Sequence, residues 1–193
     1  MSNIILSSYF QPSIEIEWEK SSNFLHRVFY HLILFTPKFR EILTREIAIE
    51  LEEIFKEITG TKGYDLLGVV ILPNHAHLIL GSKPCHFIPN IFKDIGERTS
   101  FLIMRRHKDI QKKHRIKKLW SKNFGVETLG DFNIERIKNH LLDLKGHNFP
   151  DQWEKHFRGG KQGCPATKSL IKYGEIPDQG QNPISSTSFR NYY

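Results

Sequence analysis

The segment Tyr64–Gly81, YDLLGVVILPNHAHLILG, decides the fold. It holds two apolar runs, Tyr64–Leu72 and His77–Gly81, on either side of a turn-forming Pro-Asn pair, which is typical of two strands joined as a hairpin. Side chains two apart on a strand point to the same face of the sheet, so His75 and His77 are expected to present two imidazoles side by side. Such a pair suits coordination of one metal ion. One half-buried and one surface histidine would give the same sequence pattern.

The residues before the hairpin predict a strand and a helix. His26–Phe35 (HRVFYHLILF) is rich in β-branched and aromatic residues and ends before a Thr-Pro pair, whose proline cannot donate a hydrogen bond to a sheet. Thr44 is a candidate N-cap for a helix that stops at Gly60. The apolar positions of this helix recur on one face: Ile47, Leu51, Ile54, Phe55 and Ile58.

The residues after the hairpin predict two helices and one strand. A helix is expected over about Ile91–Gln111, a short strand over Phe124–Thr128, and a last helix over about Asn133–Lys145. The resulting order, β-α-β-β-α-β-α, begins with the split β-α-β pattern. The expected fold class is therefore α+β, a ferredoxin-like antiparallel sheet with helices on one face plus a C-terminal helix.

Composition bounds the class of protein. The 193 residues divide into an N-terminal extension (1–22), a domain (23–145) and a C-terminal extension (146–193), which is polar, rich in glycine and proline, and expected to be partly disordered. No run of 18 apolar residues and no signal-peptide pattern occur, so we expect a cytoplasmic protein without a membrane partner. The two cysteines, Cys85 and Cys164, are too few for a disulfide framework or a four-cysteine zinc site.

Positive charge is concentrated in one segment. The chain carries 28 Lys and Arg against 21 Asp and Glu, a net charge of +7. Residues 93–122 hold 11 basic and three acidic side chains, which gives +8 for this segment and −1 for the remainder. A basic segment of this kind predicts a surface that contacts phosphates, and a solvated charged helix is the alternative interpretation.

Four motifs in this order resemble the single-tyrosine HUH transposases of insertion sequences that move as single-stranded DNA, and their REP-associated relatives. The resemblance extends from Arg27 to Leu144. Its motifs are a first strand followed by TPKFR, the PNHAH sequence of the hairpin, a DNA-facing helix and a final strand, at residues 29–40, 73–77, 91–101 and 119–130. The fold that this resemblance implies is the one that the pattern of elements also predicts.

The resemblance implies a site and a partner. A divalent cation, Mg²⁺ or Mn²⁺, would be held by His75 and His77, and the partner would be single-stranded or hairpin DNA bound by a homodimer. The activity would be metal-dependent DNA strand cleavage and transfer. The basic segment extends the DNA-facing segment of the family, and the candidate DNA-binding residues are Lys93, Arg98, Thr99, Ser100, Arg105, Arg106 and Lys108.

The chain departs from the family at the nucleophile. The family has a tyrosine on the last helix and, four residues later, an amide that completes the metal site, whereas this chain has His140 and Leu144. Leucine cannot bind a hard cation, so Asp143 is the best available third ligand. Residues 140 and 144 still share one helix face, because they are four apart.

Three alternatives follow for the reaction. His140 attacks phosphorus itself, since imidazole is an adequate nucleophile near its pKa of about 6.5. Or a tyrosine of the C-terminal extension, such as Tyr173, Tyr192 or Tyr193, takes that role. Or the chain no longer cleaves DNA and is a repurposed DNA-binding module. An RNA-binding ferredoxin-like domain is less well supported, because the strands carry no aromatic pattern of the kind that stacks on RNA bases.

Overall fold

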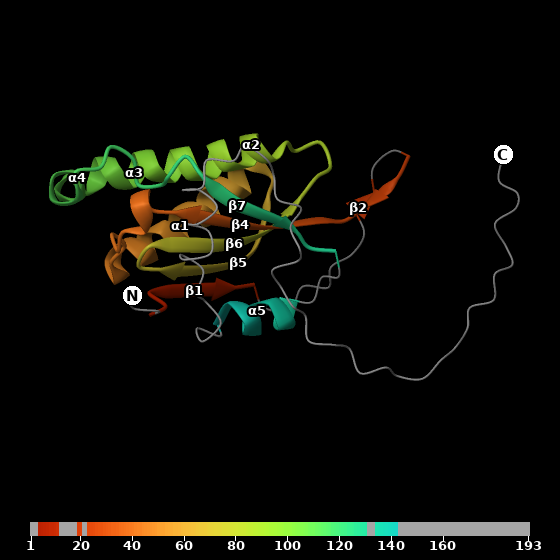
Figure 1. Ribbon diagram of the computed structural model, residues 1–193. Helices are drawn as coiled ribbons and strands as arrows, with labels where there is room; N and C mark the ends of the chain where they lie inside the picture. Colours follow the sequence, from red (N-terminus) through yellow and green to blue (C-terminus); the bar gives the residue numbers. More distant parts are fainter. Residues whose placement is uncertain (1–3, 12–18, 21–22, 131–133, 143–193) are drawn as a thin grey trace, which may run out of the picture. The chain divides into compact units, whose positions relative to one another are not determined.

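A computed structural model describes residues 4–11, 19–20, 23–130 and 134–142, all within one compact unit of residues 1–158. Five strands form an antiparallel sheet in the order β1-β5-β6-β4-β7, which runs from bottom to top in Figure 1. Without β1 this is the ferredoxin-like strand order, so the expected α+β fold class is confirmed. The strands are β1 (Ser7–Phe10), β4 (Val28–Phe35), β5 (Asp65–Leu72), β6 (His75–Ser82) and β7 (Phe124–Thr128).

The connections between these strands supply the helices. The described residues contain α1 (Arg45–Lys62), α2 (Ile88–Phe92), α3 (Arg98–Arg106), α4 (Lys108–His114) and α5 (Ile134–Leu142), with a π-helical turn at Lys93–Glu97 and a 3₁₀ turn at Pro37–Phe39. Two short strands, β2 (Glu19–Lys20) and β3 (Leu25–His26), pair with each other outside the main sheet. No helix among the described residues is long and apolar enough to cross a membrane.

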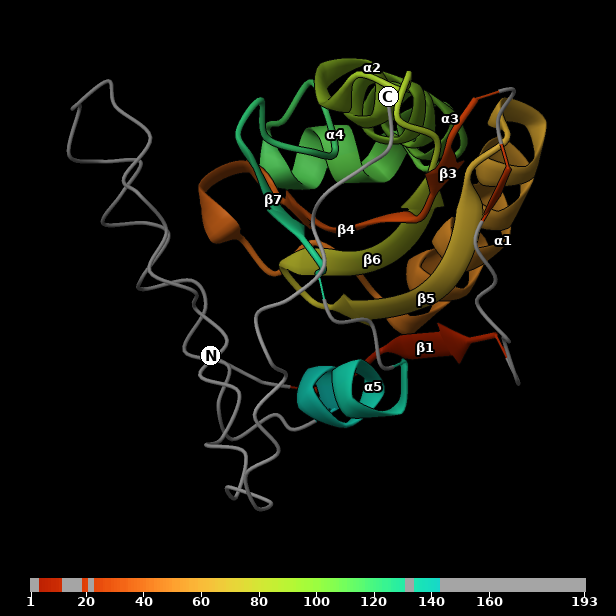
Figure 2. The same ribbon diagram turned by 90° about the vertical axis from the view of Figure 1, so that its right-hand side faces the viewer.

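The two faces of the sheet carry separate hydrophobic clusters. On the face under α1 and α3, which we call the helix face, the core includes Leu32, Leu34, Val69, Ile71, Ala76 and Leu78. On the opposite face, which we call the α5 face, Ile137 and Leu141 of α5 pack with Phe29, Val70 and Ile79. Figure 2 shows α2 to α4 and α5 on opposite sides of the sheet. Alternate residues of the same strands therefore lie under different helices.

The predicted helix after Thr44 is present and runs further than expected. The Thr44 hydroxyl accepts a hydrogen bond from the Ile47 backbone N–H at 3.4 Å, as an N-cap residue does. The helix passes Gly60 and ends at Lys62, because Gly63 adopts the left-handed conformation (φ 70°) that terminates it. The expected stop at Gly60 was therefore wrong.

Two further features differ from the sequence expectations. Strand β1 lies inside the predicted N-terminal extension and pairs with β5, an edge pairing that was not expected. The predicted helix Ile91–Gln111 begins instead at Ile88 and breaks at His107, where the backbone is non-helical (φ −109°, ψ 68°) and the ring hydrogen-bonds Glu50 of α1. The expected ends of the last helix, Asn133 and Lys145, lie outside the described residues.

Candidate metal and nucleic-acid site

The turn between β5 and β6 fixes the start of the strand that carries the two histidines. The Asn74 carbonyl accepts hydrogen bonds from the backbone N–H of Thr36, at 3.0 Å, and from its hydroxyl, at 2.9 Å. The Pro73 carbonyl accepts from the N–H groups of Ile42 and Leu43, both at 2.9 Å. The turn is thereby held by the segment that follows β4, and β6 begins at His75, two residues before the expected start.

His75 and His77 lie on the same face of the sheet. Their ring centroids are 4.8 Å apart, and the residues are 2% and 0% exposed. Between and after them, Ala76 and Leu78 point to the helix face and belong to its core. The expectation that both imidazoles share one side of the strand is confirmed, and cation binding by the pair stays a prediction.

A third histidine, which sequence reasoning did not assign to the site, joins this pair. His31 on β4 is 4% exposed, and its Nε2 lies 2.9 Å from Nδ1 of His77. The two rings are stacked with centroids 5.1 Å apart. The signal was present in the sequence, because the period of two that places Phe29 on the α5 face also places His31 there.

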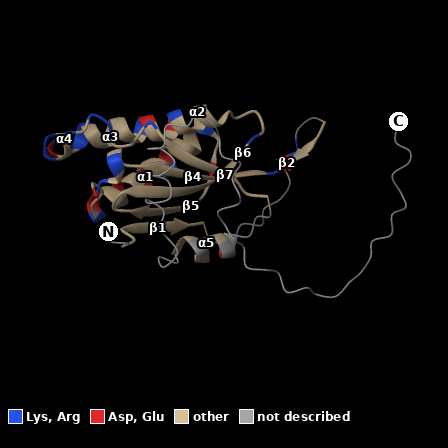
Figure 3. Ribbon diagram, viewed as in Figure 1, with Lys and Arg blue, Asp and Glu red and all other residues tan. Residues whose placement is uncertain are grey.

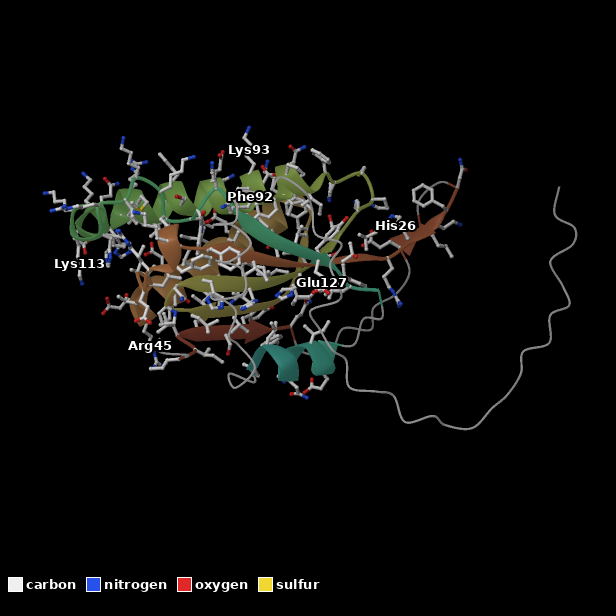
Figure 4. The ribbon with its side chains drawn as sticks, viewed as in Figure 1. His26, Arg45, Phe92, Lys93, Lys113 and Glu127 are labelled. Carbon is white, nitrogen blue, oxygen red and sulfur yellow. The ribbon has the colours of Figure 1, made fainter. Side chains whose placement is uncertain are left out.

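Protein groups hold Nδ1 of both predicted ligands. Nδ1 of His75 is 2.6 Å from Oδ1 of Asn74, an acceptor, so this nitrogen carries the proton. On β7, a Glu127 carboxylate oxygen lies 4.0 Å from Nδ1 of His31, and burial raises the pKa of this carboxyl. In the tautomer with the proton on His77 Nδ1, this nitrogen donates to His31 Nε2 and leaves His77 Nε2 without a proton. Figure 4 labels Glu127 on β7.

This arrangement fits divalent-cation ligands in part. An imidazole whose Nδ1–H is donated to a protein group binds a metal through Nε2, and such second partners orient metal-binding histidines in general. Within the described ranges, no group of three or more His, Cys, Asp or Glu side chains is arranged to hold a metal ion. The predicted third ligand, Asp143, and Leu144 lie outside the described residues. His140 falls on α5, and its side chain is not among those described.

Five of the predicted DNA-binding residues are exposed on the helices that cover the helix face: Lys93, Arg98, Arg105, Arg106 and Lys108. Figure 3 shows basic residues gathered along α2 to α4, and in Figure 4 Lys93 projects away from the sheet. Arg106 forms an ion pair with Glu50. Burial raises the pKa of Glu50, but hydrogen bonds from Arg106 and His107 outweigh this and lower it overall.

Thr99 and Ser100 were predicted to contact DNA, and the structure buries both. The Thr99 hydroxyl accepts from the Trp120 indole N–H at 2.8 Å, and the Ser100 hydroxyl accepts from the Leu119 backbone N–H at 2.8 Å. The two residues are 0% and 5% exposed. These two hydrogen bonds hold the segment before β7 against α3. Thr99 or Ser100 could contact DNA only if its hydroxyl first lost this hydrogen bond.

A ferredoxin-like sheet with two histidines on either side of one hydrophobic residue, on an internal strand, defines the class of HUH proteins. Residues 24–142 match the family described as "Transposase IS200 like", and the chain belongs to this family.

Curated relatives and a solved structure agree with this family. The ISDra2 transposase TnpA of Deinococcus radiodurans is 21% identical over 128 residues, which are 66% of this chain and 91% of that protein. The transposase for insertion sequence element IS200 of Salmonella typhimurium is 21% identical over 113 residues, 58% of this chain and 73% of the relative. A crystal structure of a transposase candidate from Deinococcus radiodurans R1 shares the fold, with a TM-score of 0.55, 24% identity, and coverage of 65% of this chain and 97% of that one.

Proposed function

We propose that this protein is a cytoplasmic, homodimeric, transposase-like protein that binds single-stranded or hairpin DNA and uses a divalent cation at His75 and His77. The observation that carries the proposal is the pair of buried imidazoles 4.8 Å apart on one strand, each with its Nδ1 held by a protein group. Metal-dependent DNA strand cleavage and transfer is the activity that the family supports. A catalytically inactive DNA-binding module is the second candidate.

The donor set favours one cation of the two expected. Imidazole nitrogen is a softer ligand than the oxygens that Mg²⁺ prefers, so two histidines suit Mn²⁺ better than Mg²⁺. When bound, the cation would polarise the scissile phosphate and reduce the charge barrier to in-line attack. The chain's own contribution is to hold two Nε2 atoms in place from an internal strand. Asp143 remains the proposed third ligand.

Basic side chains on α2 to α4 would supply the DNA affinity. We propose that Lys93, Arg98, Arg105, Arg106 and Lys108 contact phosphates, which adds affinity without choosing sequence. Replacing Arg105, Arg106 and Lys108 by Ala should flatten the dependence of affinity on salt by roughly one unit per lost phosphate contact. An unchanged dependence of affinity on salt would show that these side chains contact solvent and not DNA.

The nucleophile is tested by the chemistry of a covalent adduct. Labelled single-stranded DNA carrying a hairpin is incubated with the full chain and Mn²⁺, and any protein–DNA adduct is treated with mild acid. Attack by His140 forms a P–N bond to imidazole, breaks the phosphodiester P–O bond and releases a 3′-hydroxyl, and the adduct is lost in acid. An acid-stable adduct that persists in His140→Ala would contradict histidine attack and indicate Tyr173, Tyr192 or Tyr193.

The absence of an adduct would favour the second candidate, a binding module. In that case His140→Tyr combined with Leu144→Gln should restore cleavage, because both changes return the family's nucleophile and amide to one helix face. Both are needed, since a phenol gains little from an incompletely ligated cation. Failure of this double variant, with DNA binding retained, would support a repurposed protein.

A further inference from the structure

A basic groove opens where β4 ends. Four of its basic residues belong to the basic segment 93–122, but none is among the candidate DNA-binding residues named above. The groove has a volume of about 380 Å³ and lies between the 3₁₀ turn after β4 and the segment between α4 and β7. Six of its ten lining residues are basic and none is acidic: Lys38, Arg40, Arg115, Lys117, Lys118 and Lys122. A hollow lined by this many cations is a site for an anion.

The two walls of the groove are joined by two hydrogen bonds. An Arg40 guanidinium N–H donates to the His114 carbonyl at 2.6 Å, and the Ser121 backbone N–H donates to the Phe35 carbonyl at 2.7 Å. Lys38 and Arg115 hold left-handed backbone conformations, with φ of 59° and 50°. Such conformations cost free energy in residues other than glycine, so the tertiary structure enforces these two turns.

The charge of the groove is largely unopposed. In the part of the chain that the structure describes, only one of its cations has a carboxylate oxygen within 4.0 Å: Lys118, which is 3.7 Å from Glu97. In contrast, Arg106 of α3 and Lys62 of α1 each have a close carboxylate partner, Glu50 and Asp94. Confining like charges without counter-charges is unfavourable, and an anionic ligand would relieve it.

The groove adjoins the histidine site. Phe35, whose carbonyl binds Ser121, lies directly opposite His75 in the β4–β6 register, and their ring centroids are 6.4 Å apart. The end of β4 that borders the groove therefore lies beside the start of β6, the strand that carries His75 and His77. The aromatic residue of the groove, Trp120, is only 3% exposed and donates its N–H to Thr99, so it offers no face for base stacking. Recognition in the groove would rest on phosphate charge.

We propose that this groove binds the sugar–phosphate backbone of the single DNA strand next to the cleavage site, without sequence preference. This inference rests on the proposed function, because it takes DNA as the partner. It deepens that function, because it assigns the DNA strand next to the cleavage site to the groove and not to the exposed surface of α2 to α4.

The test compares two variants of equal charge. The groove variant carries Lys38→Ala, Arg115→Ala and Lys117→Ala, and the control variant carries Lys20→Ala, Arg45→Ala and Lys83→Ala, which are exposed and lie outside the groove. The probe is a labelled, unstructured oligothymidine, and its affinity is measured over a range of salt concentrations. We expect the groove variant to bind at least about tenfold more weakly and to lose about two units of salt slope, with little change in the control. Equal losses in both variants would overturn the proposal.

A second measurement uses the unaltered chain, so that it does not depend on folding of the variant. Bound oligothymidine should protect Lys38 and Lys117 from acetylation, read by mass spectrometry, while Lys83 stays reactive. Full reactivity of Lys38 and Lys117 at saturating DNA would contradict the groove. Failure of the unaltered chain to bind any single-stranded DNA would instead overturn the proposed function, and the inference with it.

Discussion

The two faces of the central sheet are built from the same strands, but the buried side chains of β6 make different contacts on each face. On the helix face of β6, Ala76 and Leu78 are fully buried among apolar side chains of α1 and α3. On the α5 face of the same strand, His75 and His77 are equally buried and contact polar groups. The difference teaches that burial alone does not mark an apolar core position, because alternate residues of one buried strand contact apolar groups on one face and polar groups on the other.

The largest expected effect is on the helix face. Leu78→Ala should lower the free energy of unfolding by about 2–5 kcal/mol, because it removes buried methyl groups and leaves a cavity. Urea denaturation followed by circular dichroism measures this loss. Mn²⁺ affinity of the folded fraction should be unchanged, and a stability loss below about 1 kcal/mol would weaken the contrast between the faces.

The next effect is on the α5 face. His77→Ala should lower Mn²⁺ affinity by about 100-fold or more, since it removes one of two proposed imidazole ligands. Isothermal titration with Mn²⁺ measures it, and His86→Ala is a matched control, because His86 contacts Ser82 at the other end of β6. Equal affinity in both variants would exclude the histidine pair as a metal site.

A smaller effect on Mn²⁺ affinity is expected for His31, which contacts a proposed ligand but is not itself a proposed ligand. His31→Phe fills the same space but removes the nitrogen that lies 2.9 Å from His77 Nδ1. Loss of such an orienting partner typically costs about 10–100-fold in metal affinity, so we expect a decrease in this range with Nε2 still the ligating atom. Nitrogen chemical shifts of the imidazoles would report the tautomer of His77, and an unchanged tautomer and affinity would make His31 a packing residue.

The smallest effect concerns the pH dependence of stability and involves Tyr64, which packs in the core of the helix face. Burial, together with a hydrogen bond to the Asp94 carboxylate and its charge, raises the pKa of Tyr64 from 10.0 to about 12. The folded state therefore retains the phenol proton more strongly, so this stabilisation is complete below pH 10 and is lost as pH rises toward 12. Tyr64→Phe should reduce the loss of stability over this alkaline range. An identical pH dependence in the variant would contradict the raised pKa.

Local patterns predicted the elements whose cause is local. The Thr44 cap, the apolar stripe of α1 and strand Phe124–Thr128 were all predictable, since capping and period-two or period-3.6 patterns reside in the sequence itself. Alternation also placed His75 and His77 on one face. The same alternation along the first strand places His31 on the face of Phe29, so His31 was predictable in the same way.

The features that escaped prediction depend on distant contacts. Strand β1 is four residues long and is defined by its pairing with β5, where Gly68 makes room for Phe10; a Cβ at Gly68 would lie 2.7 Å from the Phe10 ring. The break at His107 involves Glu50, 57 positions earlier in the chain. The basic groove requires two segments about 80 residues apart to meet. The periodicity of a sequence does not indicate such long-range contacts.

The position of the three histidines within the sheet has a consequence for motion. His31 lies on β4 and the other two lie on β6, and each of these strands is hydrogen-bonded to a neighbour on both sides. Internal strands open mainly when the whole domain opens, so amide hydrogens around His75 and His77 should exchange with solvent among the slowest in the chain. A cation bound by His75 and His77 would therefore bind and dissociate without local unfolding of the strand that carries them.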